Sequence, residues 1–138
     1  GDAVCHAIID AILGAAAAGN VGSHFPPSDD EWKDADSMDL LARAMRVLDA
    51  RDYRVGNIDV TVICETPKIG PHIDAMRMSL AKVLHVPSTA ISIKGKTNEK
   101  MGWIGAGEGL AVHAVALIKP QSGAAGGEAG SGGGAWPL

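Results

Sequence analysis

The sequence has 138 residues with a formal net charge of −4, and hydrophobic residues make up 46% of it. That is enough apolar material for one domain, but only 4% of the residues are aromatic, so small side chains must build the core. Such a core favours association between copies of the chain. The acidic balance excludes a basic field for nucleic acid or an anionic membrane, and no apolar run approaches the roughly 20 residues that span a bilayer. We therefore expect neither nucleic acid nor a membrane as a partner.

The first half of the chain predicts two helices joined by a long ordered loop. Residues 2–18 favour a helix with Asp2 as its N-cap, and an apolar stripe is formed at helical spacing by Val4, Ile8, Ile12 and Ala15. Residues 19–36 combine glycine, proline and carboxylates, which is typical of a functional loop. Ser37 is predicted to cap the second helix, whose inner face consists of Leu40, Leu41, Ala44, Met45 and Leu48.

The second half predicts three strands and one helix. Residues 57–63 alternate as a strand with one wetter face, and a helix begins near Pro71. A second strand is expected over 90–96 and a glycine-punctuated loop over 97–107. A third strand over 109–118 is apolar on both faces, so we expect one of them to meet another subunit.

This element order indicates an α+β fold with the helices packed on one sheet. We expect the folded domain to occupy residues 1–119 and the glycine-rich residues 120–138 to form a disordered tail. The two cysteines, Cys5 and Cys64, lack a CxxC spacing, so we expect free thiols rather than a disulfide framework. Because the sequence opens directly on a helix start without Met, we also expect a further segment before Gly1.

Three clusters carry the candidate chemistry. His6 lies one helical turn from both Asp2 and Asp10, which suits a metal ligand with acidic neighbours or a partly buried structural histidine. Lys96 and Thr97 offer a cation and a hydroxyl to a phosphate, and Glu99 could hold a hard cation, although a generic polar loop would look the same. The segment 66–71 either presents backbone groups to a base edge or is an ordinary strand-to-helix turn.

Three longer segments of the chain contain these clusters in a specific order: GDAVCHAIIDAILGAAAAGNVGSHFPPSDDEWKDADS, NIDVTVICETPKIGPHI and KGKTNEKMGWIGAGEGLAVHAVALI. In this order and spacing they resemble the 2-C-methyl-D-erythritol 2,4-cyclodiphosphate synthase family. The resemblance implies a lyase of non-mevalonate isoprenoid synthesis that cyclises 4-diphosphocytidyl-2-C-methyl-D-erythritol 2-phosphate and releases CMP. It also implies a mixed sheet, a homotrimer around a threefold axis with active sites between subunits, and Zn²⁺ with Mg²⁺ or Mn²⁺ as cofactors.

The resemblance assigns roles residue by residue. It makes His6 a zinc ligand, Glu99 the ligand of the second metal and Thr97 the catalytic residue at the diphosphate, with Asp2 and Asp10 in support. The substrate contacts that it implies are Asn20, Val21, Gly22, Phe25, Asp29, Lys33, Lys96, Asn98 and Trp103. The cytidine pocket that it implies is formed by Cys64, Glu65, Thr66, Pro67, Lys68, Ile69 and Gly70.

Several positions depart from the family pattern. The opening D-x-H pair, which supplies two zinc ligands in the family, has no counterpart, so we expect the 138 residues to be inactive alone. Asn20 and Pro27 stand where the family has Asp, and Ala106 where some bacterial members have Arg. These departures keep open a non-catalytic cytidine-nucleotide-binding or assembly module and, more remotely, an unrelated trimeric structural protein. Lys96 resembles plant and algal members and implies the plastid stroma, with a bacterial cytoplasm as the alternative.

Overall fold

The computed structural model describes residues 2–26, 28, 36–66 and 68–121, apart from the side chain of Asp2. Predictions that fall on Pro27, Asp29, Lys33, Pro67 and residues 122–138 lie outside the described residues. The described elements are α1 (Asp2–Ala15), α2 (Val21–His24), α3 (Ser37–Ala50), β1 (Tyr53–Ile63), the 3-10 turn η2 (Gly70–His72), α4 (Ile73–Leu84), the 3-10 turn η3 (Ser88–Ala90), β2 (Ile91–Lys96), α5 (Gly102–Gly105) and β3 (Ala111–Pro120).

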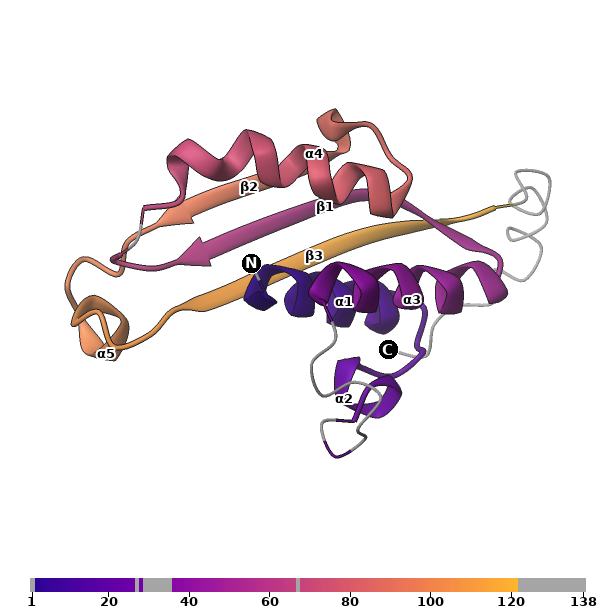
Figure 1. Ribbon diagram of the computed structural model, residues 1–138, viewed down its shortest axis with the longest axis horizontal. Helices are drawn as coiled ribbons and strands as arrows, with labels where there is room; N and C mark the ends of the chain where they lie inside the picture. The colour runs from indigo at the N-terminus through magenta and orange to yellow at the C-terminus, as the bar shows by residue number, and fades with distance from the viewer. Residues whose placement is uncertain (1, 27, 29–35, 67, 122–138) are drawn as a thin grey trace, which may run out of the picture.

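The strands form one mixed sheet in the order β2-β1-β3 (Figure 1). The central strand β1 runs parallel to β2, with Ile58 beside Ile91, and antiparallel to β3, with Tyr53 beside Pro120. The predicted α+β class and mixed sheet are confirmed. Each chain supplies one such sheet, and the single chain leaves the predicted homotrimer untested.

Strand β1 begins at Tyr53, four residues before the predicted start at Asn57. The reason is a bulge: Val55 pairs with Ile118 and Asn57 with Leu117, so Gly56 has no partner across the ladder. A Cβ at position 56 would stand 3.1 Å from the Leu117 carbonyl oxygen, so the close approach requires glycine. The bulge interrupts the period-two alternation, which is why the pattern did not predict the first four residues of this strand.

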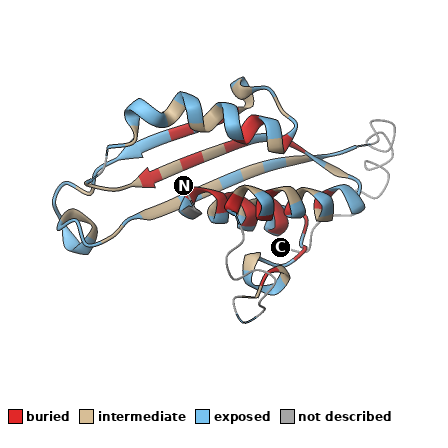
Figure 2. Cartoon of the chain, viewed as in Figure 1, coloured by how far each residue is buried: buried red, intermediate tan, exposed pale blue. Residues whose placement is uncertain are grey.

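The helices cover one face of the sheet, and the buried residues lie between them and the strands (Figure 2). In β1 the buried side chains are those of Val55, Ile58, Val60 and Val62. On the opposite face, Asp59 accepts a hydrogen bond from Lys94 Nζ at 3.0 Å. The third strand leaves Val115 and Leu117 69% and 54% exposed, so its second apolar face is not covered within the chain.

Helix α1 buries two adjacent stripes because it packs against both β3 and α3. Val4, Ile8 and Ile12 of the predicted stripe are buried, but Ala15 is exposed and that part of the prediction was wrong. The second stripe was not predicted, and it consists of Cys5, Ile9, Leu13 and Ala16. A helix enclosed on two sides needs a wider apolar surface than one stripe provides.

Helix α3 starts as predicted at Ser37, but its N-cap is Asp36, whose Oδ1 accepts the Met38 N–H at 2.8 Å. The cap predicted at Ser37 was therefore wrong, because Ser37 is the first helical residue and is buried. Serine and aspartate both cap helices well. Because Ser37 is buried as the first helical residue, Asp36 is the residue whose side chain accepts an unpaired N–H of the first turn. Among the described residues, no helix has the length and apolarity that a membrane crossing requires.

One arginine joins α4 to the start of β2. Arg77 Nε donates to the Ile91 carbonyl at 2.8 Å and its Nη2 donates to the Ser88 carbonyl at 3.0 Å, while Nη1 lies 3.3 Å from Asp74 Oδ1. The Arg77 side chain is 29% exposed and that of Asp74 is 92% exposed. The two carbonyl contacts therefore matter more for stability than the ion pair does.

We predict that Arg77→Ala lowers the free energy of unfolding by about 2–3 kcal/mol, because two backbone carbonyls lose a charged donor. Asp74→Ala is the matched control, which removes the exposed ion pair and an acidic residue of the first turn of α4, together worth about 1 kcal/mol or less. Urea denaturation followed by circular dichroism measures both. Equal losses in the two variants would show that the carbonyl contacts contribute nothing.

Candidate functional site

Two loops meet where β1 and β2 end. Because these strands are parallel, their carboxyl ends lie at the same edge of the sheet, where α/β proteins commonly bind ligands. Residues 64–70 follow β1 and residues 97–101 follow β2. The Cys64 N–H donates to the Lys96 carbonyl at 2.9 Å, which continues the strand pairing into the loops. The segment predicted to bind cytidine and the loop predicted to bind the diphosphate therefore lie side by side.

A pocket of about 350 Å³ opens between these two loops. This volume suits a small-molecule site. Lys68 and Lys96 give its rim two cations, and Thr97 adds a hydroxyl. Its lining residues are Val62, Cys64, Glu65, Lys68, Ile69, Gly70, Pro71, Ile73, Gly95, Lys96 and Thr97. Most of the described residues of the predicted cytidine segment thus share one pocket with the predicted catalytic threonine.

Glycine at position 95 lets the Ile69 side chain approach strand β2 closely at this pocket. A Cβ there would lie 2.9 Å from Cγ1 of Ile69, a contact that real Cβ atoms essentially never make. Ile69 can therefore pack flat against the end of β2 and present an apolar surface to a flat ring.

The loop after β2 is held in a tight conformation. Glu99 and Lys100 both have left-handed φ values, of 53° and 61°, which non-glycine residues seldom adopt. The Glu65 carboxylate accepts the Asn98 N–H at 2.8 Å and the Lys100 N–H at 3.3 Å. The Glu99 N–H donates to Thr97 Oγ1 at 3.3 Å. The side chains of Glu65 and Thr97 thus take part in the loop's own hydrogen bonding.

The segment 20–22 lies elsewhere, against the end of α1. Asp10 Oδ1 accepts the Val21 N–H at 2.7 Å, so Asp10 joins α1 to the start of α2, and its support role in a site stays a prediction. Asn20 caps the short helix α2, accepting the Ser23 N–H at 2.9 Å, while Ser23 Oγ accepts the Asn20 N–H at 3.0 Å. This helix was not predicted, although the residue types Asn and Ser at this spacing are a cap signal. Phe25, predicted to contact substrate, is buried in the core.

The remaining predicted residues do not line the pocket between the loops. His6 is exposed on α1, and Trp103 is 55% exposed on α5. The side chain of Asn98 donates to the Met101 carbonyl at 2.8 Å. Within the described part of the chain, no three His, Cys, Asp or Glu residues are grouped so that they could hold a metal ion. The described residues of one chain therefore do not complete a zinc site, which takes three protein ligands.

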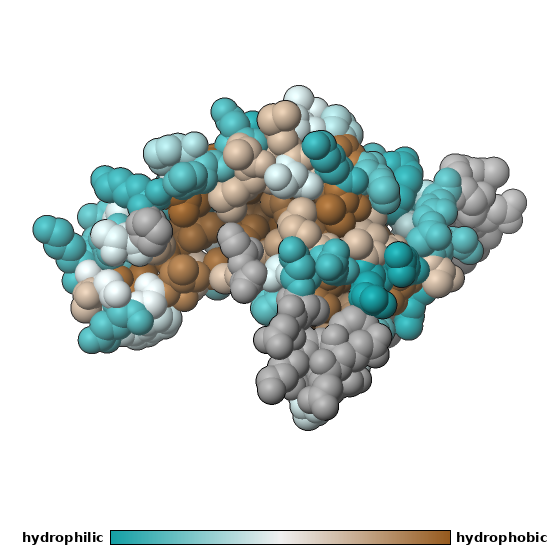
Figure 3. All heavy atoms as spheres, in the orientation of Figure 1, coloured by the Kyte–Doolittle hydropathy of each residue, from teal (hydrophilic) through white to brown (hydrophobic). Residues whose placement is uncertain are grey.

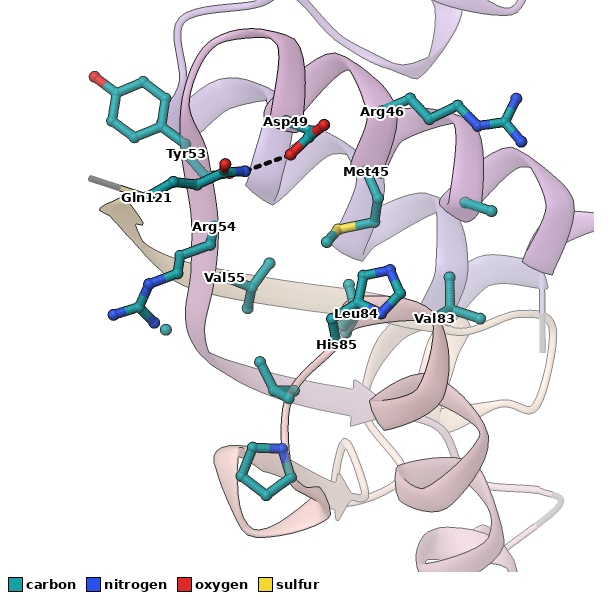
Figure 4. A pocket seen from close by; sticks show the side chains of 14 residues that line it. Met45, Arg46, Asp49, Tyr53, Arg54, Val55, Val83, Leu84, His85 and Gln121 are labelled. Atoms are coloured by element: carbon teal, nitrogen blue, oxygen red, sulfur yellow. Dashed lines mark hydrogen bonds between the residues drawn. The ribbon is translucent and has the colours of Figure 1, made fainter. Parts of the chain in front are cut away.

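Two hollows larger than this pocket lie away from these loops. The larger, about 660 Å³, is at the opposite end of the sheet, and Figure 4 shows Met45, Val55, Leu84 and His85 at its centre with Arg46 and Arg54 turned outward. There the Gln121 side-chain amide donates hydrogen bonds to Asp49 Oδ1 and, at 2.8 Å, to the Tyr53 carbonyl. The other, about 380 Å³, belongs to the apolar band between α4 and the α1–α3 pair in Figure 3. We favour the smaller pocket at the loops because it alone combines cations, a hydroxyl and residues predicted to bind ligand.

We predict that Gly105→Ala disturbs the loop after β2, because the added Cβ would stand 2.1 Å from the Lys100 carbonyl carbon. Binding of CDP, measured by calorimetry, should weaken by about tenfold or more, since a displaced loop cannot hold Thr97 at the pocket. Gly14→Ala is the control: nothing lies within 4 Å of its Cβ position, so the variant should bind normally and gain about 0.5–1 kcal/mol of stability. Undiminished CDP binding by Gly105→Ala would contradict a role for this loop.

Comparisons with known proteins agree on one family. The YgbB family model matches residues 1–119. A 2-C-methyl-D-erythritol 2,4-cyclodiphosphate synthase from Xanthomonas oryzae is 52% identical over 118 residues, which are 86% of this chain and 72% of that protein. A bifunctional enzyme IspD/IspF from Novosphingobium aromaticivorans is 51% identical over 117 residues, and the match covers 85% of this chain but only 30% of that protein.

Solved structures give the same result. The bifunctional IspDF from Campylobacter jejuni superposes with a TM-score of 0.82 at 36% identity, covering 86% of this chain and 32% of that one. IspF from Plasmodium falciparum, in a CDP complex, superposes with a TM-score of 0.77 at 33% identity, covering 88% of this chain and 73% of that one. The predicted resemblance to the cyclodiphosphate synthases is thereby confirmed, and the chain belongs to the YgbB family.

Proposed function

We propose that this chain carries the activity for which its relatives are named. The substrate is 4-diphosphocytidyl-2-C-methyl-D-erythritol 2-phosphate, and the product is the 2,4-cyclodiphosphate. An oxygen of the 2-phosphate attacks the β-phosphorus, forming a new P–O bond, while the bond from that phosphorus to the α-phosphate oxygen breaks and CMP leaves. No protein nucleophile is needed, so the protein contributes positioning and charge stabilisation.

The observation that carries this proposal is the pocket shared by the two loops. It is lined by Cys64, Glu65, Lys68, Ile69 and Gly70 of the segment expected to receive the base, together with Lys96 and Thr97 of the loop expected to meet the diphosphate. Because Thr97 Oγ1 accepts the Glu99 N–H, its own proton is free to donate to a phosphate oxygen. Lys68 and Lys96 add positive charge for the developing negative charge of the transition state.

The chain offers a partial donor set for the proposed cations. Glu99 is exposed on the loop beside Thr97, and one carboxylate together with substrate phosphate oxygens is a common Mg²⁺ or Mn²⁺ environment. Such a cation, when bound, neutralises phosphate charge. Zn²⁺ at His6 stays a prediction, because among the described residues this side chain belongs to no group of three His, Cys, Asp or Glu residues that could hold the ion. We therefore assign no step of the reaction to zinc.

A trimer is part of the proposal because one chain separates the predicted residues. His6 and the segment 20–22 do not line the pocket that holds Thr97, so a complete site needs a neighbouring copy to bring them together. The exposed Val115 and Leu117 supply an apolar surface on the sheet for that contact. The plastid location predicted from Lys96 remains a prediction, and the bacterial sequence relatives lend it no support.

We predict that the full-length protein releases CMP from this substrate in the presence of Mg²⁺, and that Thr97→Ala lowers kcat by about tenfold to a thousandfold. Thr97→Ser should retain most of the rate because it keeps the hydroxyl. Thr89→Ala, an exposed threonine away from the pocket, is the control. ³¹P NMR follows both products. CDP binding without turnover would instead establish the non-catalytic nucleotide-binding module. A protein that showed no binding and no turnover would refute both the enzyme and the binding module.

We predict that the protein has three times the mass of one chain in solution and that Leu117→Asp shifts the equilibrium from trimer toward monomer. A carboxylate placed in an apolar contact loses its hydration without gaining a partner, so the dissociation constant should rise by about tenfold or more. Met78→Asp, an equally exposed apolar residue on α4, is the matched control. Sedimentation equilibrium measures both, and a Leu117→Asp variant that assembles as tightly as the Met78→Asp control would remove this face from the interface.

A further inference from the structure

Glu65 belongs by sequence to the segment expected to bind the base, but its side chain is turned toward the other loop. Its Oε1 accepts the Asn98 N–H at 2.8 Å and the Lys100 N–H at 3.3 Å, across 33 and 35 positions of sequence. Glu65 is half-buried, its bond to the Asn98 N–H is partly buried, and its bond to the Lys100 N–H is exposed. A single oxygen thus joins two amide groups that lie two residues apart.

These two amides converge on one carboxylate oxygen, as they would on a bound anion. Successive N–H groups in a turn that contains left-handed residues point toward one side and attract negative charge. Glu99 and Lys100 provide that conformation, with φ values of 53° and 61°. Such backbone strain persists only where surrounding contacts maintain it, and the Glu65 carboxylate does so from outside the loop by accepting charge-assisted hydrogen bonds from the Asn98 and Lys100 amides.

The bonds of Glu65 bracket the group that orients Thr97. The Glu99 N–H lies between the two amides that Glu65 holds, and it donates to Thr97 Oγ1 at 3.3 Å. Fixing residues 98 and 100 therefore helps to hold the Glu99 N–H against Thr97 Oγ1, which occupies one lone pair of this hydroxyl. These contacts connect Glu65, in the segment expected to bind the base, to Thr97, the residue proposed to meet the diphosphate.

We infer that Glu65 is a positioning residue that couples the base-binding segment to the diphosphate-binding loop. This inference rests on the proposed function, because it assigns those two roles to the two loops. By filling the anion site itself, Glu65 also keeps a substrate phosphate from occupying these amides, so the phosphate is left to Thr97 and Lys96. The carboxylate acts through the loop and does not touch the reacting atoms.

Hydrogen exchange tests the inference without any ligand. In Glu65→Ala the amides of Asn98 and Lys100 should exchange at least about tenfold faster, because they lose their acceptor. The Cys64 amide, bonded to the Lys96 carbonyl, should keep its protection and so report that the strand pairing survives. Glu65→Gln keeps an acceptor oxygen and should restore part of the protection. Unchanged exchange at Asn98 and Lys100 in Glu65→Ala would overturn the inference.

Calorimetry with CMP and with CDP in the presence of Mn²⁺ tests the functional consequence. Glu65→Ala should weaken CDP binding by about tenfold but CMP binding by no more than about twofold, since only the loop that meets the β-phosphate is loosened. Glu65→Gln should recover part of the CDP affinity, and Asp39→Asn, an exposed carboxylate on α3, should change neither value. Equal losses for CMP and CDP would mean that Glu65 merely supports the fold of its own segment, and the inference would fail. If the unaltered protein bound neither nucleotide, the proposed function itself would fall.

Discussion

The parallel pairing of β1 with β2 is the constraint on which the site depends. It sends the chain out of the sheet twice at one edge, and the Cys64 amide bonded to the Lys96 carbonyl carries the pairing one step beyond the last strand residue. The loops that follow are consequently placed by the rigid core and not by their own contacts alone. A pocket built in this way can be approached closely by a flat ring on one side and a charged group on the other.

The rest of the molecule supports that edge. Helix α4 follows directly from the 3-10 turn η2, and Arg77 fixes it to the beginning of β2 and to the turn that precedes this strand. Helix α1 is enclosed by the sheet and α3, and its outward Asp10 anchors the start of α2. Helix α1 contributes two apolar stripes to this core, which increases the apolar area that a chain with few aromatic residues can bury.

Sequence patterns predicted the long helices and the three strands, because period and capping signals there agree with the tertiary contacts. These patterns failed where a contact with another part of the chain determined the local structure. The start of β1 depends on a bulge at Gly56 that only its pairing with β3 reveals, and the cap of α3 depends on the burial of Ser37. The family resemblance identified the two loops, but no local pattern could reveal the contact of Glu65, since its partners lie 33 and 35 residues away.

The pinning of Gln121 to Asp49 and the Tyr53 carbonyl has a practical consequence. It secures the last described residue at the end of the sheet remote from the pocket between the two loops, and β3, with ten residues, spans roughly 33 Å between the two ends. A dye or immobilisation handle attached beside Gln121 would sit far from that pocket. That position offers an anchor for single-molecule or surface-based measurements in which the binding loops must stay unencumbered.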